Sequence, residues 1–134
     1  MADPDRLAET YRTAVAAQRA GHAQEASAGY AAVLAADPDH LAARNNLAVL
    51  LADGGDAAAA AACYRDGLSR HPGSAELNAN FANLLRAAGD LDGAVRHYAR
   101  AVEIAPHLGE VHYALGVALR TLGRGARAPG SRCC

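Results

Sequence analysis

The residues most able to do chemistry in this chain are three asparagines spaced to share one face of neighbouring helices. Asn46 and Asn80 are 34 residues apart, and Asn83 follows Asn80 by one helical turn. An amide side chain carries both donors and an acceptor, so a row of amides can bind a peptide backbone without requiring particular side chains. This spacing therefore predicts binding rather than catalysis. The alternative is that these amides lie on a solvated helix face or hydrogen-bond to the next helix.

Histidine, cysteine and acidic side chains do not have the spacing of a catalytic or metal site. His97 and Cys63 are 34 residues apart, and two ligands on helices about 8–10 Å apart do not complete a tetrahedral site. Asp90 and Asp92 open a helix, where the helix dipole favours negative charge. Four other histidines fall at expected turns: His22, His40, His71 and His107. We therefore expect no catalytic residue, no metal, no cofactor and no enzyme activity.

Composition is typical of a small folded protein that is neither basic nor membrane-bound. The chain has 134 residues, 51% of them hydrophobic and 20% charged, with a formal net charge of −1 and no lysine. This charge balance argues against nucleic acid or an anionic membrane as a partner. No stretch reaches the ~20 apolar residues of a membrane helix, and the start lacks the pattern of a signal peptide. We expect a cytoplasmic protein, and the abundance of alanine, glycine and arginine is typical of a GC-rich, bacterial genome.

Internal repetition at 34 residues indicates how these side chains are positioned. One series is proline (Pro38, Pro72, Pro106), one is tyrosine (Tyr30, Tyr64, Tyr98), and one is glycine (Gly21, Gly55, Gly89, Gly123). Two further series are alanine (Ala26, Ala60, Ala94) or another small residue (Ala14, Ala48, Ala82, Gly116). Apolar residues between the turns recur at three- and four-residue spacing, which predicts helices and no strands.

Each repeated residue type has a physical role in a pair of helices. The glycine ends the first helix in a left-handed turn, and Asp56 or Asp90 after it caps the second helix. The proline ends the second helix because it lacks an amide donor. The small residues let two antiparallel helices approach closely, and the tyrosines fill the space between one pair and the next.

This repeat resembles the tetratricopeptide repeat, most clearly in Leu47-Ala48…Gly55…Ala60…Tyr64…Pro72 and Phe81-Ala82…Gly89…Ala94…Tyr98…Pro106. The resemblance implies an all-α fold, a right-handed superhelical solenoid of antiparallel helix pairs. It predicts one repeat domain over residues 1–123, with three full repeats (approximately 7–40, 41–74 and 75–108) and one final helix in 109–123. Thr13 departs from the family because a large apolar residue is usual there, and Gly67 replaces a usual alanine.

The resemblance also implies a concave groove that is lined by the first helices and binds an extended peptide or a partner's helix. The groove residues that we predict are Tyr11, Arg12, Val15, Asn45, Asn46, Val49, Ala79, Asn80, Asn83, Arg86, Tyr113, Val117 and Arg120. The segment Asn80-Phe81-Ala82-Asn83-Leu84 is similar to repeats of the O-linked N-acetylglucosamine transferases, whose amides bind the substrate backbone. Binding of acidic chaperone tails is not expected, since there is no lysine and Glu110 and Ala114 stand where basic residues would be needed.

The last residues do not continue the repeat. The final helix is predicted over 109–122 and ends at Gly123; residues 124–134 have no apolar periodicity, so we predict a disordered tail. Either the reading frame is truncated or shifted, or the apolar end of the last helix pairs with another subunit or with a lost downstream domain. The sequence thus predicts a protein-interaction scaffold. The alternatives are a non-catalytic targeting region of a larger glycosyltransferase- or sulfotransferase-type enzyme, and a homodimer formed through the uncapped last helix.

Overall fold

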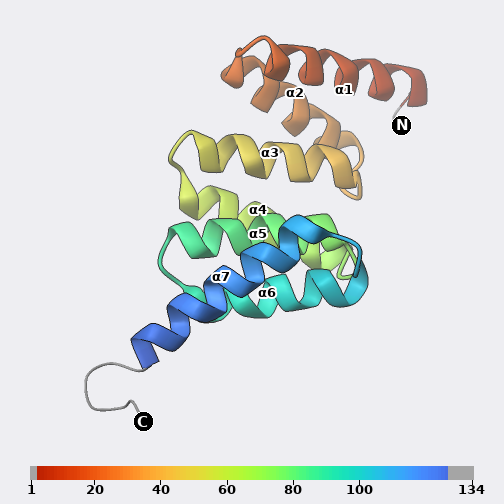
Figure 1. Ribbon diagram of the computed structural model, residues 1–134. Helices are drawn as coiled ribbons and strands as arrows, with labels where there is room; N and C mark the ends of the chain where they lie inside the picture. Colours follow the sequence, from red (N-terminus) through yellow and green to blue (C-terminus); the bar gives the residue numbers. More distant parts are fainter. Residues whose placement is uncertain (1–2, 127–134) are drawn as a thin grey trace, which may run out of the picture. The chain divides into compact units, whose positions relative to one another are not determined.

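The computed structural model describes residues 3–126, and within that range the chain forms seven α-helices and no β-strand (Figure 1). The helices are α1 (Pro4–Arg19), α2 (Ala23–Ala36), α3 (Leu41–Asp53), α4 (Ala57–Arg70), α5 (Ala75–Ala87), α6 (Leu91–Ile104) and α7 (Gly109–Ala126). Three helix pairs are followed by one further helix. The prediction of an all-α repeat fold is confirmed.

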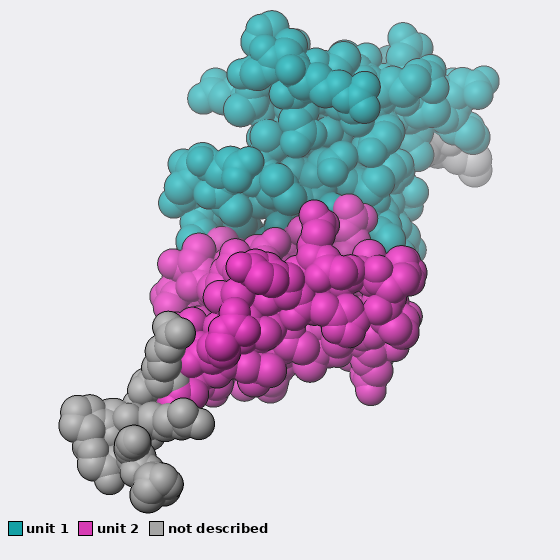
Figure 2. Space-filling view, in the orientation of Figure 1, with its two compact units in different colours: residues 1–72 teal, residues 73–134 magenta. Residues whose placement is uncertain are grey.

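The chain divides into two compact units, which are coloured separately in Figure 2. Unit 1 is Met1–Pro72 and contains α1 to α4; unit 2 is Gly73–Cys134 and contains α5 to α7. Within unit 1, each helix packs against the next one along the chain, and the same holds for α5, α6 and α7 in unit 2.

The turns inside each pair have the predicted chemistry. Gly21, Gly55 and Gly89 have φ angles of 84°, 88° and 90°, a left-handed conformation that L side chains rarely adopt. After each of these glycines the next amide bonds back to the helix, as in Asp56 N to Leu51 O at 2.9 Å. The side chain of Asp56 then accepts a hydrogen bond from Ala59 N at 3.1 Å and so caps α4.

The prolines lie where the second helices have ended. α2 ends at Ala36, and Pro38 follows its cap residue. The carbonyl oxygen of Pro38 accepts a hydrogen bond from Arg44 Nη2 at 2.8 Å. His112 Nε2 donates to the Pro106 carbonyl oxygen in the same way, also at 2.8 Å. A side chain six residues after the proline therefore fixes the loop in both places.

The core of each pair combines buried tyrosine with alanine. Tyr30, Tyr64 and Tyr98 are at most 2% exposed, as the sequence predicts. Close approach of the helices is visible at Gly29 on α2, where an added Cβ would stand 2.7 Å from the Cβ of Ala14 on α1. Ala14 is itself buried, so the small residues do allow the two helices to pack tightly.

The end of the last helix differs from the prediction. α7 continues through Ala126, so Gly123 lies inside the helix and residues 124–126 are helical rather than part of a tail. The physical reason is that Gly123 does not take the left-handed conformation of Gly21, Gly55 and Gly89, and the arginine and alanine that follow it favour helix. Residues 127–134 of the predicted disordered tail lie outside the described part of the chain. No helix in the described part is long and apolar enough to cross a membrane.

Candidate functional site

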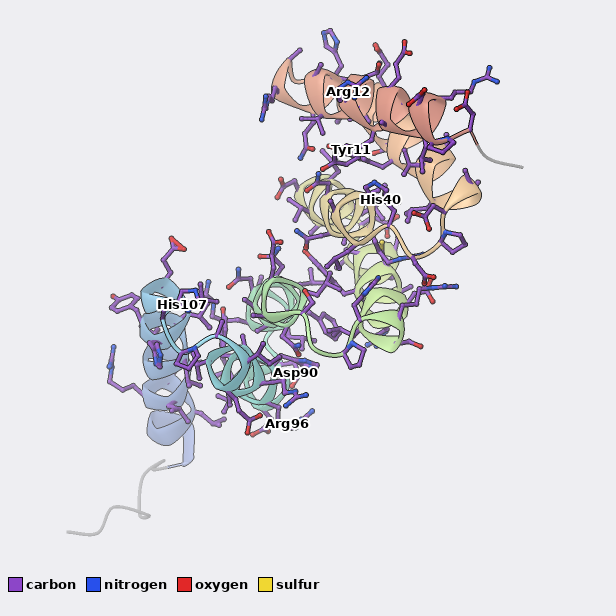
Figure 3. The ribbon with its side chains drawn as sticks, turned by 90° about the vertical axis from the view of Figure 1, so that its right-hand side faces the viewer. Tyr11, Arg12, His40, Asp90, Arg96 and His107 are labelled. Atoms are coloured by element: carbon purple, nitrogen blue, oxygen red, sulfur yellow. The ribbon has the colours of Figure 1, made fainter. Side chains whose placement is uncertain are left out.

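The predicted groove residues of unit 1 lie on α1 and α3. Tyr11 on α1 is half-buried, and its ring centroid is 4.8 Å from that of His40 and 5.9 Å from that of Tyr30. Figure 3 shows Tyr11 and His40 in the space between α1 and α3. His40 is the N-cap of α3, because its Nδ1 accepts a hydrogen bond from Ala43 N at 3.1 Å. The aromatic contact between Tyr11 and His40 therefore joins α1 to the beginning of α3.

Asn46 joins three helices through hydrogen bonds of its amide nitrogen. Asn46 Nδ2 donates to the hydroxyl oxygens of Tyr11 and Tyr30, at 3.3 Å in each case. The Tyr30 hydroxyl in turn donates to Gln18 Oε1. We call these four residues the amide–tyrosine cluster: Tyr11, Gln18, Tyr30 and Asn46. Burial raises the pKa of Tyr30, although the hydrogen bond from Asn46 opposes the shift, so Tyr30 stays a neutral donor.

The other predicted residues of unit 1 differ in accessibility. Arg12 is exposed and forms no ion pair with any residue of the described range 3–126. Val15 and Val49 are half-buried. Asn45 is only 5% exposed, so its amide is largely enclosed by the protein. Asn46 is therefore the amide of α3 that a ligand can reach most readily.

In unit 2, Asn83 and Arg86 on α5 are both exposed and both contact Tyr98 of α6. The Tyr98 hydroxyl donates to Asn83 Oδ1, and the Arg86 guanidinium carbon lies 5.9 Å from the centroid of the tyrosine ring. Burial raises the pKa of Tyr98, with the charge of Arg86 opposing the shift. Asn80, one turn earlier, is half-buried, and Ala79 is 8% exposed.

The predicted residues of α7 present a mixed surface. Tyr113 is 72% exposed, Arg120 is exposed, and Val117 is half-buried. Leu119 is 48% exposed, whereas Val111 and Ala118 are buried in the core of unit 2. Of the predicted residues of α7, Tyr113 and Arg120 are thus accessible, and Leu119, which was not predicted, is accessible as well.

An ion-pair network in unit 1 was not predicted from the sequence. Arg44 is 9% exposed, and its Nη1 lies 2.7 Å from Asp66 Oδ2, so α3 and α4 are tied by charge. Arg70 Nη1 lies 2.9 Å from Asp39 Oδ1 and extends the network to the loop before α3. Only the four-residue spacing of Asp66 and Arg70 could have been found in advance.

His97 and Cys63, which we weighed as metal ligands, each have a protein partner. His97 Nδ1 is 3.0 Å from Asn78 Oδ1, and burial lowers its pKa, reinforced by Arg96 and opposed by Asp90. Cys63 Sγ donates to the Arg44 carbonyl oxygen at 3.4 Å, and burial raises the pKa of its thiol. Both side chains therefore serve contacts between the two helices of a pair.

Two family models match the chain. One, described as Tetratricopeptide repeat, matches residues 11–75, and the other, described as TPR repeat, matches residues 82–123. The chain belongs to the tetratricopeptide repeat (TPR) family. No curated protein matches it in sequence.

Solved TPR structures are similar over most of the chain. The first TPR of Spaghetti (RPAP3), bound to an HSP90 peptide, is 18% identical with a TM-score of 0.84, over 90% of this chain and 96% of that one. The Yersinia enterocolitica chaperone SycD, in complex with a peptide of the translocator YopD, is 18% identical with a TM-score of 0.81, over 88% and 95%. At this identity the likeness shows the TPR fold alone.

The O-GlcNAc transferase of Thermobaculum terrenum has a higher sequence identity. It is 28% identical with a TM-score of 0.78, and the match covers 89% of this TPR chain but only 23% of the transferase. The expected resemblance to transferase-type TPR arrays is confirmed, and it extends to a quarter or less of that enzyme.

Proposed function

We propose that this TPR chain is a scaffold that binds an extended segment of another protein along the first-helix face of its units. It performs no chemistry of its own in this proposal. Two similar proteins, Spaghetti (RPAP3) and SycD, have peptides bound in their structures, which supports a peptide as the ligand. The residues that we assign to binding are the predicted groove residues that remain accessible, above all Arg12, Asn46, Asn83 and Tyr113.

One observation carries the proposal, namely the orientation of the Asn46 amide. Two tyrosine hydroxyls hold its nitrogen, whereas its Oδ1 accepts no hydrogen bond from any residue of 3–126. The carbonyl oxygen is thus fixed in place as an acceptor without a protein donor. A peptide N–H is the group that such an acceptor binds without selecting a side chain.

Asn83 in unit 2 has the complementary arrangement. Its Oδ1 is used by the Tyr98 hydroxyl, while its Nδ2 donates to no residue of the described chain. The exposed amide therefore offers two donors to a peptide carbonyl. Each unit therefore presents an amide group that can bind a peptide backbone, an acceptor in unit 1 and donors in unit 2.

The test is a peptide selected by display on this chain and measured by calorimetry. Replacing Asn46, Asn80 and Asn83 together by alanine should weaken binding by about tenfold or more, because each lost hydrogen bond is worth about 0.5–1.5 kcal/mol. Ser69→Ala, an exposed change on α4, is the matched control and should leave affinity unchanged.

The same peptide made with N-methylated backbone amides gives a second measurement. Methylation at one position should reproduce the loss caused by Asn46→Ala, and the two changes together should cost no more than either alone. Equal affinity of the triple variant and the natural chain would refute the groove assignment.

A second candidate function is supported by the 28% identity to the transferase array, of which this chain covers 23%. In that case the chain is the non-catalytic targeting region of a larger glycosyltransferase- or sulfotransferase-type enzyme. Reading the genomic DNA past residue 123 in all frames discriminates the two. A resumed repeat followed by a catalytic domain would favour the enzyme, and a stop in every frame would favour the stand-alone scaffold.

Homodimer formation through α7 also stays a proposal, and the exposure of Leu119 supports it. Light scattering of a variant with Leu119 and Leu122 made polar tests it. A monomeric mass for both the natural chain and the variant would remove this possibility. The cytoplasmic location and the bacterial source remain predictions of the sequence.

A further inference from the structure

A hollow of about 330 Å³ lies between α1 and α2, away from the amide–tyrosine cluster. Its wall and floor include Thr10, Thr13 and Ala17 of α1 and Gly29 of α2. Thr13 follows Tyr11 by two residues, so the two side chains leave α1 about 200° apart. Since Tyr11 turns toward His40 and α3, the hollow opens on a different side of α1. All of its residues belong to unit 1.

The repeat register explains why the hollow exists. Thr13 stands two repeat lengths before Phe81, and Gly29 stands two repeat lengths before His97. In unit 2 the rings of Phe81 and His97 pack against each other with their centroids 4.8 Å apart. In the first helix pair these positions hold the smaller Thr13 and a glycine, which has no side chain. The hollow therefore marks the place that two aromatic rings occupy elsewhere in the same chain.

The hollow cannot be filled from α2. A Cβ at position 29 would stand 2.7 Å from the Cβ of Ala14 and 3.3 Å from its Cα, closer than such atoms approach. Glycine is thus required for α1 and α2 to pack. Because a side chain at position 29 would push the helices apart, the hollow is not filled from that position.

The rim carries more negative than positive charge. Glu9, Glu25 and Arg6 all line the hollow and are exposed, so two carboxylates and one guanidinium leave one net negative charge. Glu9 forms no ion pair with any residue of 3–126, and Glu25 has only His22, at 3.8 Å. The Thr10 hydroxyl is already used, since it donates to the Arg6 carbonyl oxygen at 2.9 Å.

We propose that this hollow is a second binding site, which accepts an aromatic side chain of a protein partner from a segment with an adjacent basic residue. The ring takes the place that Phe81 and His97 fill in unit 2, against Ala14, Ala17 and Gly29. The basic residue pairs with the carboxylates of the rim. The volume of the hollow is at the small end of the roughly 300–1,000 Å³ range of ligand pockets, which is enough for one aromatic side chain.

The test is a titration of the whole chain, followed in ¹H–¹⁵N spectra, with the capped dipeptide acetyl-Phe-Arg-amide. Saturable shifts are expected at the amides of Thr10, Thr13 and Gly29. Acetyl-Ala-Arg-amide lacks the ring and should give no saturable shift at these amides. Acetyl-Phe-Glu-amide should bind about twofold to fivefold more weakly, the size of an exposed charge pair.

The decisive variant is Thr13→Phe, which fills the hollow with the residue found in the same register of unit 2. It should abolish the shifts, whereas Ala8→Phe adds the same ring to an exposed site of α1 and should leave them intact. If Thr13→Phe does not fold, Thr13→Leu serves instead, because Leu47 and Leu115 occupy that register.

Three results would overturn the proposal. One is unchanged binding in the folded Thr13 variant. Another is a set of shifts spread over the chain or confined to the amide–tyrosine cluster. The third is a shift of the hollow's amides with protein concentration alone, which would make a second copy of the chain the occupant. The peptide groove is tested separately, by the affinity of the Asn46, Asn80 and Asn83 variant, so the two proposals can fail independently.

Discussion

The hydrogen bonds of Asn46 should stabilise unit 1 even when no ligand is bound. The amide nitrogen reaches two hydroxyls at 3.3 Å, which is long for a hydrogen bond, so each contact is expected to contribute at the low end of the usual 0.5–1.5 kcal/mol. Replacing Asn46 with alanine should therefore lower the free energy of unfolding by about 1 kcal/mol. The loss is not larger because the Tyr30 hydroxyl keeps its bond to Gln18.

A double-mutant cycle isolates this contribution from other effects of the substitution. Asn46→Ala, Tyr30→Phe and the double variant are unfolded in urea, with circular dichroism as the signal. The coupling energy between the two sites should be about 0.5 kcal/mol, at the lower end of the range for residues in contact. A drop of about 4 °C in the melting temperature should accompany Asn46→Ala.

Because the chain has two compact units, hydrogen exchange of the α1 and α3 amides is the control measurement. Protection should fall there and stay unchanged in α6. Additive single and double variants, or an unchanged midpoint for Asn46→Ala, would refute the reasoning. In that case the whole amide would be available to a ligand rather than its carbonyl oxygen alone.

Three further predictions concern turns, pH and charge. Gly55→Ala should cost about 1 kcal/mol, because φ is 88° there, whereas Gly73→Ala meets open space and should be near neutral in urea melts. Burial lowers the pKa of His97, so the folded chain favours the neutral imidazole. The contribution of His97 to the free energy of unfolding is therefore full above the ordinary pKa of 6.5 and decreases as the pH falls below that value. In His97→Gln the urea midpoint should decrease less between about pH 7.5 and 5 than it does in the natural chain. An equal decrease in the two proteins would contradict this prediction. Asp66→Ala removes the carboxylate that pairs with the largely buried Arg44. It should lower the free energy of unfolding by about 1–2 kcal/mol in thermal melts. Glu103→Ala breaks the exposed ion pair with Arg100 and should lower the free energy of unfolding by under about 0.5 kcal/mol. Equal losses for Asp66→Ala and Glu103→Ala would show that burial of the arginine does not matter.

The fold was predictable because each repeated residue acts locally. Gly55 and Asp56 act within one turn, where a left-handed glycine and a capping carboxylate have the same effect in any helix pair. The length of α7 was predicted wrongly for the same reason. Gly123 has the register of a turn, but α7 continues through it to Ala126.

The candidate site was only partly predictable. The spacing of Asn46 and Asn80 indicates their face, but the direction of an amide depends on which hydroxyls reach it, and Tyr11 lies 35 residues away in sequence. Similarly, nothing near Arg44 in sequence identifies Asp66 as its partner. Thr13 stood out as a departure from the repeat, but the hollow also requires Gly29, whose importance depends on the distance between two helices.

The two hydrogen bonds to proline carbonyls have a consequence for how such repeats diverge. Arg44 and His112 differ in shape and charge. Even so, each directs a side-chain nitrogen to the carbonyl oxygen of the proline six residues before it. This position of the repeat therefore needs a side chain that is long enough to donate a hydrogen bond to the loop, and more than one residue type meets that need. A sequence alignment scores these two repeats as different at this position, although a side chain holds the loop in the same way in both. Residue identity between the repeats of this chain therefore understates how much of their hydrogen bonding is shared.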